Sequence, residues 1–134
     1  MASFESLVPG GSTVRLIHLE DSAIGDVTVL ALSGRMVRNE NFGALQDKVR
    51  HLVQEGRRKL VLDLAGVSYM DSTCHGEIVS GFVTVRRNGG LLHFASPTAR
   101  VERLMTTAGL ATTFRTFPSE REAVSSLAGP LLEH

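Results

Sequence analysis

The side chains with the most chemical potential lie in one short stretch, Asp71-Ser72-Thr73-Cys74-His75-Gly76. This stretch offers a carboxylate, two hydroxyls, a thiol and an imidazole in nearly consecutive positions. Such groups could serve as a phosphorylation site or as a nucleophilic or redox-active thiol. Asp and Ser are also favoured as N-terminal caps of helices, so a purely structural role for Asp71 or Ser72 is the simplest alternative.

The spacing argues against catalysis by Cys74 and His75 together. Neighbouring residues on a helix point about 100° apart, so these two side chains cannot form a dyad. The positions of His18, His51 and His93 do not match the spacing of a metal site. We therefore expect no catalytic residue, no metal and no cofactor. The enzymatic alternative is a Cys74-dependent redox or hydrolytic activity. At the level of the residue, the alternative to an ordinary packed thiol is a redox-sensing thiolate.

The composition limits the classes of protein to consider. A chain of 134 residues is one domain in length and can bury a core without a metal or disulfide. Its single cysteine excludes a disulfide scaffold, and we expect a cytoplasmic protein. Fourteen Lys and Arg balance fourteen Asp and Glu, and there is no Trp, so we expect no nucleic-acid partner. The apolar runs are too short for membrane insertion, and we expect no signal peptide.

Apolar periodicity and turn residues predict strands that alternate with helices after an opening hairpin. The strands are expected over residues 14–19, 27–32, 59–64, 91–95 and 113–117, and the helices over 42–56, 72–88, 97–109 and 119–128. The apolar run 59–64 does not alternate, which indicates a central strand covered on both faces. This order predicts an α/β fold with a mainly parallel central sheet of about five strands and four helices.

Local signals place the helix ends, and we expect the first helix to end near Gly56 and the second at Asn88-Gly89-Gly90. We expect Asn39-Glu40-Asn41 to cap the first helix, Ser96-Pro97 to begin the third, and Ser119 with Glu122 to form a capping box at the fourth. Basic residues at 57–59 and 86–87 are expected to be solvated, because cations are favourable at the carboxyl ends of helices.

Three segments follow from these patterns. Residues 1–12 are expected to be a flexible leader, because they end in Pro9-Gly10-Gly11-Ser12 and show no sustained period. Residues 13–130 form the domain. Residues 131–134 are a C-terminal tail compatible with a cloning remnant.

These elements and motifs together resemble the STAS domain, named for sulfate transporters and anti-sigma factor antagonists. The resemblance spans roughly residues 14–128 and is greatest to the stand-alone bacterial antagonists. It is carried by Leu32-Ser33-Gly34, the strand Leu60-Val61-Leu62-Asp63-Leu64, the motif at 71–76, the turn Gly89-Gly90-Leu91 and Ser96-Pro97.

The resemblance implies a partner switch. In such proteins the serine after the aspartate, here Ser72, is phosphorylated by an anti-sigma factor that is also a serine kinase. The unphosphorylated antagonist binds this kinase, the phosphorylated form releases it, and a phosphatase resets the system. Thr73 is the second choice of acceptor, and Asp71 would cap the helix or hold the acceptor hydroxyl. The domain itself would not be an enzyme, and a weak homodimer stays open.

The sequence departs from the family pattern at two places. Cys74 and His75 replace a glycine and an apolar residue, and Arg35 lies where an acidic residue is common. The resemblance therefore implies an unusual partner or an unusual contact. The expected partner-binding residues are Arg35, Asp71, Ser72, Thr73, Cys74, His75 and Gly76.

An alternative function does not involve phosphorylation. STAS domains also serve as unmodified scaffolds or subunits of signalling and lipid-transport assemblies, and the same fold would suit that role.

Overall fold

The computed structural model describes residues 17–36, 44–70, 74–107 and 114–128. They form a five-stranded sheet in the order β1-β2-β3-β4-β5, in which β1 is antiparallel to β2 and the other neighbours are parallel. The described elements are β1 (Ile17–Ile24), β2 (Val27–Met36), α2 (Ala44–Gln54), β3 (Lys59–Met70), α3 (Cys74–Arg87), β4 (Leu91–Ala95), α4 (Ala99–Thr107), β5 (Thr116–Phe117) and α5 (Glu120–Ser126).

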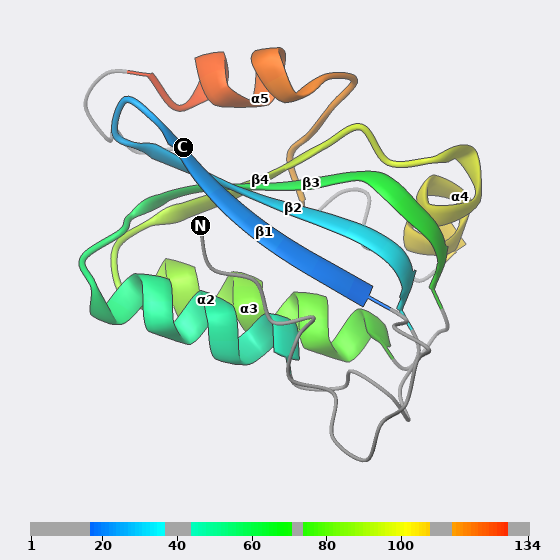
Figure 1. The fold of residues 1–134 in the computed structure, drawn as a ribbon, viewed down its shortest axis with the longest axis horizontal. Helices are drawn as coiled ribbons and strands as arrows, with labels where there is room; N and C mark the ends of the chain where they lie inside the picture. The colour runs from blue at the N-terminus through cyan, green and yellow to red at the C-terminus, as the bar shows by residue number, and fades with distance from the viewer. Residues whose placement is uncertain (1–16, 37–43, 71–73, 108–113, 129–134) are drawn as a thin grey trace.

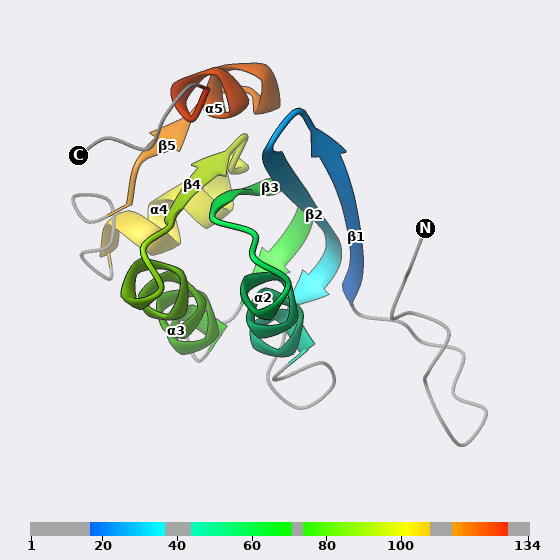
Figure 2. The same cartoon turned by 90° about the vertical axis from the view of Figure 1, so that its left-hand side faces the viewer.

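Helices cover both faces of this sheet. Helices α2 and α3 lie against one face and α5 lies against the other, whereas α4 lies near the end where β2 and β3 finish (Figure 1, Figure 2). Leu60, Leu62 and Leu64 of β3 belong to the large core beneath α2 and α3, while Val61 belongs to the smaller core beneath α5. The predicted fold class, the opening hairpin and the doubly covered central strand are confirmed.

Helices α2 and α3 end as the glycine positions predict. Gly56 and Gly89 have φ angles of 92° and 82°, a left-handed conformation that glycine adopts at little cost. The N–H of Gly89 donates to the carbonyl of Arg86 at 3.1 Å, and that of Gly90 donates to Val85 at 3.0 Å. This pair of hydrogen bonds is a Schellman motif, which satisfies helix carbonyls that would otherwise be unpaired.

The β2–β3 ladder is irregular near its carboxyl end. Its register shifts between Ala31 and Ser33 and again between Gly34 and Arg35. A Cβ added to Gly66 of β3 would lie 2.7 Å from the Cβ of Ser33, so only glycine allows the two strands to approach this closely. Bulges of this kind redirect the side chains that follow them.

Several predicted boundaries are wrong by a few residues. Strand β3 continues to Met70, beyond its expected end at residue 64, because its pairing with β2 resumes after the bulges. The described part of the second helix begins at Cys74, and its expected start near Ser72 lies outside the described residues. The last strand contains only Thr116 and Phe117, while Phe114 packs in the core against Phe94.

Of the caps predicted for the last two helices, the first is wrong and the second is confirmed. Helix α4 begins at Ala99, and Thr98, not Ser96, caps it, because its Oγ1 accepts the N–H of Val101 at 3.2 Å. Ser119 caps α5 as expected, accepting the N–H of Glu122 at 3.1 Å. The caps proposed at 39–41, the leader 1–12 and the tail 131–134 lie outside the described residues.

Thr28 in β2 places an unsatisfied hydroxyl in the core, and one substitution should remove it. It is 2% exposed, and in the described part of the chain its hydroxyl has no hydrogen-bond partner. Since an unsatisfied buried hydroxyl costs about 1–3 kcal/mol, we expect Thr28→Val to raise the free energy of unfolding by about 1 kcal/mol. Urea denaturation measures the change.

The same substitution at Thr98 is the matched control. There the hydroxyl caps α4, so Thr98→Val should lower the free energy of unfolding by about 1 kcal/mol. Destabilisation by both variants would contradict the assignment of the Thr28 hydroxyl as a buried, unsatisfied group.

Candidate functional site

The candidate site lies where β2 and β3 end and α3 begins. Asp71, Ser72 and Thr73 join Met70 to Cys74 and lie outside the described residues. Parallel strands present their carboxyl ends at one edge of the sheet, and functional loops of open α/β folds gather there. Met70 and Cys74, the described residues on either side of this link, lie at this edge. We call it the docking edge and define it by the carboxyl ends of β2 and β3 and the first turns of α3 and α4.

The other predicted site residues flank this link. Cys74 and His75 form the first residues of α3, and their side chains lie outside the described part of the chain. Gly76 follows them, is exposed, and has no other atom within 4 Å of the position that a Cβ would occupy. Arg35 comes from β2 and is exposed, and its Cα pairs with Tyr69 across the ladder. The structure thus brings Arg35 to the same edge as the motif.

Two arginines contact the ring of Tyr69. The Cζ of Arg35 lies 5.6 Å from the ring centroid and the Cζ of Arg100, in α4, lies 5.9 Å from it. Both distances fall within the usual limit of about 6 Å for a cation–π interaction. Three elements therefore meet at one aromatic side chain. Sequence reasoning missed Tyr69 and Arg100, since no spacing signal connects residues so far apart in the chain.

A buried carboxylate connects the start of α3 to the start of α2. Glu77 is 3% exposed, and its Oε2 accepts the N–H groups of Leu45 at 2.9 Å and Gln46 at 3.2 Å. These donors belong to the first turn of a helix, where backbone N–H groups have no intrahelical partner. Glu77 thereby fixes the orientation of α3 directly after the motif. This cap was also missed, because it comes from another helix.

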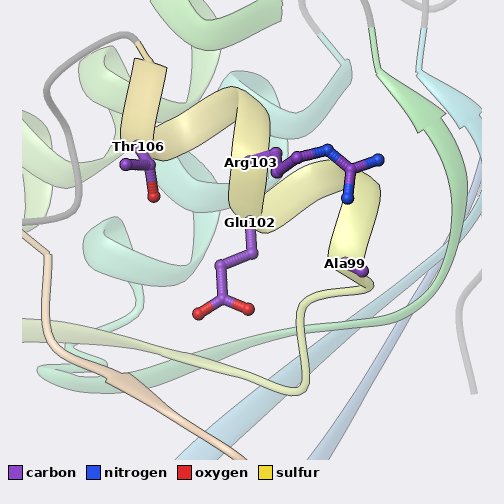
Figure 3. A pocket seen from close by; sticks show the side chains of 4 residues that line it. All are labelled: Ala99, Glu102, Arg103 and Thr106. Atoms are coloured by element: carbon purple, nitrogen blue, oxygen red, sulfur yellow. The ribbon is translucent and has the colours of Figure 1, made fainter.

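A shallow open cavity of about 370 Å³ lies beside α4 and is lined by Ala99, Glu102, Arg103 and Thr106 (Figure 3). Glu102 and Arg103 leave the helix in different directions (Figure 3). All four residues are exposed, so none offers the buried polar group that a small-molecule site uses to orient its ligand.

No group of three or more His, Cys, Asp or Glu residues among those described is arranged to hold a metal ion. Within the same residues, no helix is both long and apolar enough to cross a membrane.

The match with the STAS domain family extends over residues 18–123, which is most of the chain. The chain belongs to the STAS domain family. Its fold is similar to that of an anti-sigma factor antagonist from Mycobacterium paratuberculosis, with a TM-score of 0.75 and 19% identity over 84% of this chain and 95% of that one.

The STAS fold of this chain is also similar to that of the Bacillus anti-sigma factor antagonist SpoIIAA. The unphosphorylated form of SpoIIAA gives a TM-score of 0.72 and 16% identity over 85% of this chain and 99% of that one. The phosphorylated form gives 0.65 and 15% over 81% and 98%. These likenesses concern the fold.

Other polar side chains of this STAS domain have structural roles away from the docking edge. Lys59, expected to be solvated, is instead 7% exposed, and its Nζ lies 2.7 Å from the Oδ2 of Asp26. A hydrogen bond from Lys59 lowers the pKa of Asp26.

His93 lies buried within β4, with its Nδ1 2.7 Å from the Oγ of Ser126 in α5.

We expect Glu77→Ala to lower the free energy of unfolding by about 2–3 kcal/mol, because two helix N–H groups lose their buried acceptor. Glu77→Gln keeps an acceptor oxygen and should cost less. Glu102→Ala, on the exposed side of α4, is the control and should change stability by less than about 0.5 kcal/mol. Urea denaturation tests all three, and equal losses for Glu77→Ala and Glu102→Ala would contradict the cap.

The pH dependence of stability should reveal a carboxyl pair beneath α5. A hydrogen bond with Asp63, together with burial and the charge of Asp63, raises the pKa of Glu120 above its ordinary 4.5. Between the ordinary and the raised pKa the folded state binds more protons than the unfolded state, so the free energy of unfolding falls as pH rises. Glu120→Gln should lack this decline and be more stable than the wild type at neutral pH.

Thermal melts over that pH range measure the effect. Glu102→Gln, in α4, should retain the decline of the wild type. A decline of equal size in Glu120→Gln would show that Glu120 is not its source.

Proposed function

We propose that this STAS domain is an anti-sigma factor antagonist. It binds an anti-sigma factor that is also a serine kinase, and phosphorylation of Ser72 releases it. The observation that carries the proposal is the motif Asp71-Ser72-Thr73 between β3 and α3, in a fold shared with anti-sigma factor antagonists. One of these, SpoIIAA, has both an unphosphorylated and a phosphorylated form.

The location of Ser72 suits a reversible modification that leaves the fold intact. Ser72 comes two residues before the first residue of α3, close in sequence to helix N–H groups that lack intrahelical partners. A phosphate near a helix N-terminus is favoured by roughly 0.3–1 kcal/mol through the helix dipole. The exposed Arg35 and Gly76 on either side leave the edge open to another protein.

Release then follows from electrostatics. Phosphorylation adds about −1.5 to −2 charges to a surface that must lose water when the partner docks. Burying that charge without a partner costs several kcal/mol, and each 1.4 kcal/mol changes affinity by about tenfold. No large rearrangement of the domain is required. In this proposal the domain acts by binding alone, and a phosphatase restores the binding form.

Incubation with ATP and candidate serine kinases from the same genome tests the modification. We expect intact-mass measurement to show a gain of about 80 Da, the mass of one added phosphate, that disappears in Ser72→Ala and persists in the matched control Thr73→Ala. Loss of the gain in Thr73→Ala alone would move the acceptor to Thr73. No gain with any kinase would contradict the switch and favour the unmodified scaffold.

The phosphate mimic tests the consequence for binding. We expect Ser72→Glu to weaken binding of the anti-sigma factor by at least about tenfold while the melting temperature is unchanged, because it adds charge only to the docking surface. Isothermal titration calorimetry measures the affinity. Equal affinities for Ser72→Glu and the wild type would contradict the electrostatic mechanism.

A further inference from the structure

Three side chains from separate elements form a basic cluster at the docking edge. Arg35 comes from β2, Tyr69 from β3 and Arg100 from α4, and both guanidinium carbons lie within 6 Å of the tyrosine ring centroid. We call Arg35, Tyr69 and Arg100 the arginine–tyrosine cluster. The tyrosine is half-buried and both arginines are exposed, so a rigid base presents two solvent-facing cations.

The N–H donors of Arg35 and Arg100 are not taken up by hydrogen bonds to other described residues. Among the described residues, no carboxylate forms an ion pair with Arg35 or Arg100. Arginine and tyrosine are also the residue types that most often dominate the energy of protein interfaces.

The charge of the surroundings adds to this cluster. Arg103 lies three residues after Arg100 and therefore on the same side of α4, whereas Glu102 lies two residues after it and on another side. Figure 3 shows Arg103 and Glu102 pointing apart. Since the whole chain carries no formal net charge, the arginine–tyrosine cluster is a local concentration of positive charge.

We propose that the arginine–tyrosine cluster selects a partner that presents a cluster of carboxylates at the interface. Planar guanidinium groups bind carboxylates through paired hydrogen bonds, and the two held near Tyr69 can engage neighbouring Asp or Glu side chains. This inference deepens the proposed function, because it rests on the same edge being the docking surface. It also adds a cause of release, since a phosphate on Ser72 would compete with the carboxylates of such a partner for these arginines and would repel those carboxylates.

The chain contains its own reporter for this test. Tyr69 is the only tyrosine and there is no tryptophan, so tyrosine fluorescence of the protein reports on the cluster alone. The probe is a polyglutamate peptide, which contains no aromatic residue. We expect its titration into the full chain to change the tyrosine fluorescence, with an affinity that falls as salt is added.

Two double variants of equal charge decide where the peptide binds. Arg35→Gln with Arg100→Gln should weaken binding by about tenfold or more, because both charged donors are lost. Arg86→Gln with Arg87→Gln, at the exposed carboxyl end of α3, removes the same charge and should change the affinity by less than about twofold. Matching thermal melts establish that both variants are folded.

Three outcomes would overturn the inference. These are no change in fluorescence with polyglutamate, equal weakening in the two double variants, or tighter binding of a single-stranded oligonucleotide of the same charge. The kinase assay on Ser72 is independent of this titration. Peptide binding at the cluster without phosphorylation of Ser72 would support the acidic partner and reject the switch. Phosphorylation of Ser72 without peptide binding would support the switch and reject the acidic partner.

Discussion

The pairing of β2 with β3 is the constraint on which the rest of the structure depends. The first half of β3, residues 59–64, has side chains buried on both faces, so its backbone groups must be satisfied by neighbouring strands. Strand β2 is the parallel partner of β3 over most of its length. Two bulges and the close approach at Gly66 bend this ladder without ending it. The ladder therefore extends to Met36 and Met70, and it brings Arg35 beside Tyr69 next to the motif.

Helices add two further constraints at the same edge. Glu77 ties the first turn of α3 to the first turn of α2, which fixes the direction in which α3 leaves the motif. Helix α4 buries Val101 and Met105 in the larger core and thereby brings Arg100 to Tyr69. The docking edge is thus built on packed elements, which suits the proposed change of binding by charge without rearrangement.

The periodicity of the chain was enough to predict the fold, because each apolar pattern matches one buried face. The run 59–64 predicted the central strand, and the glycines at 56 and 89 predicted the helix ends that the Schellman motifs confirm. Boundaries that depend on pairing were less accurate. The extension of β3 to Met70 follows from hydrogen bonds with β2, and the shift of the α4 cap from Ser96 to Thr98 follows from local backbone geometry, with Ser96 at a φ of 55°.

By itself the sequence determined the STAS fold, the location of Ser72 between a buried strand and a helix, and the presence of Arg35 where the family usually has an acidic residue. These properties are local, since they follow from residue types and their spacing along the chain. Only the tertiary structure decided that Tyr69 and Arg100 join Arg35, that Glu77 caps α2, and that Lys59 is buried beside Asp26. Each of these is a contact between side chains distant in sequence, and such contacts exist only after the sheet and its helices have packed.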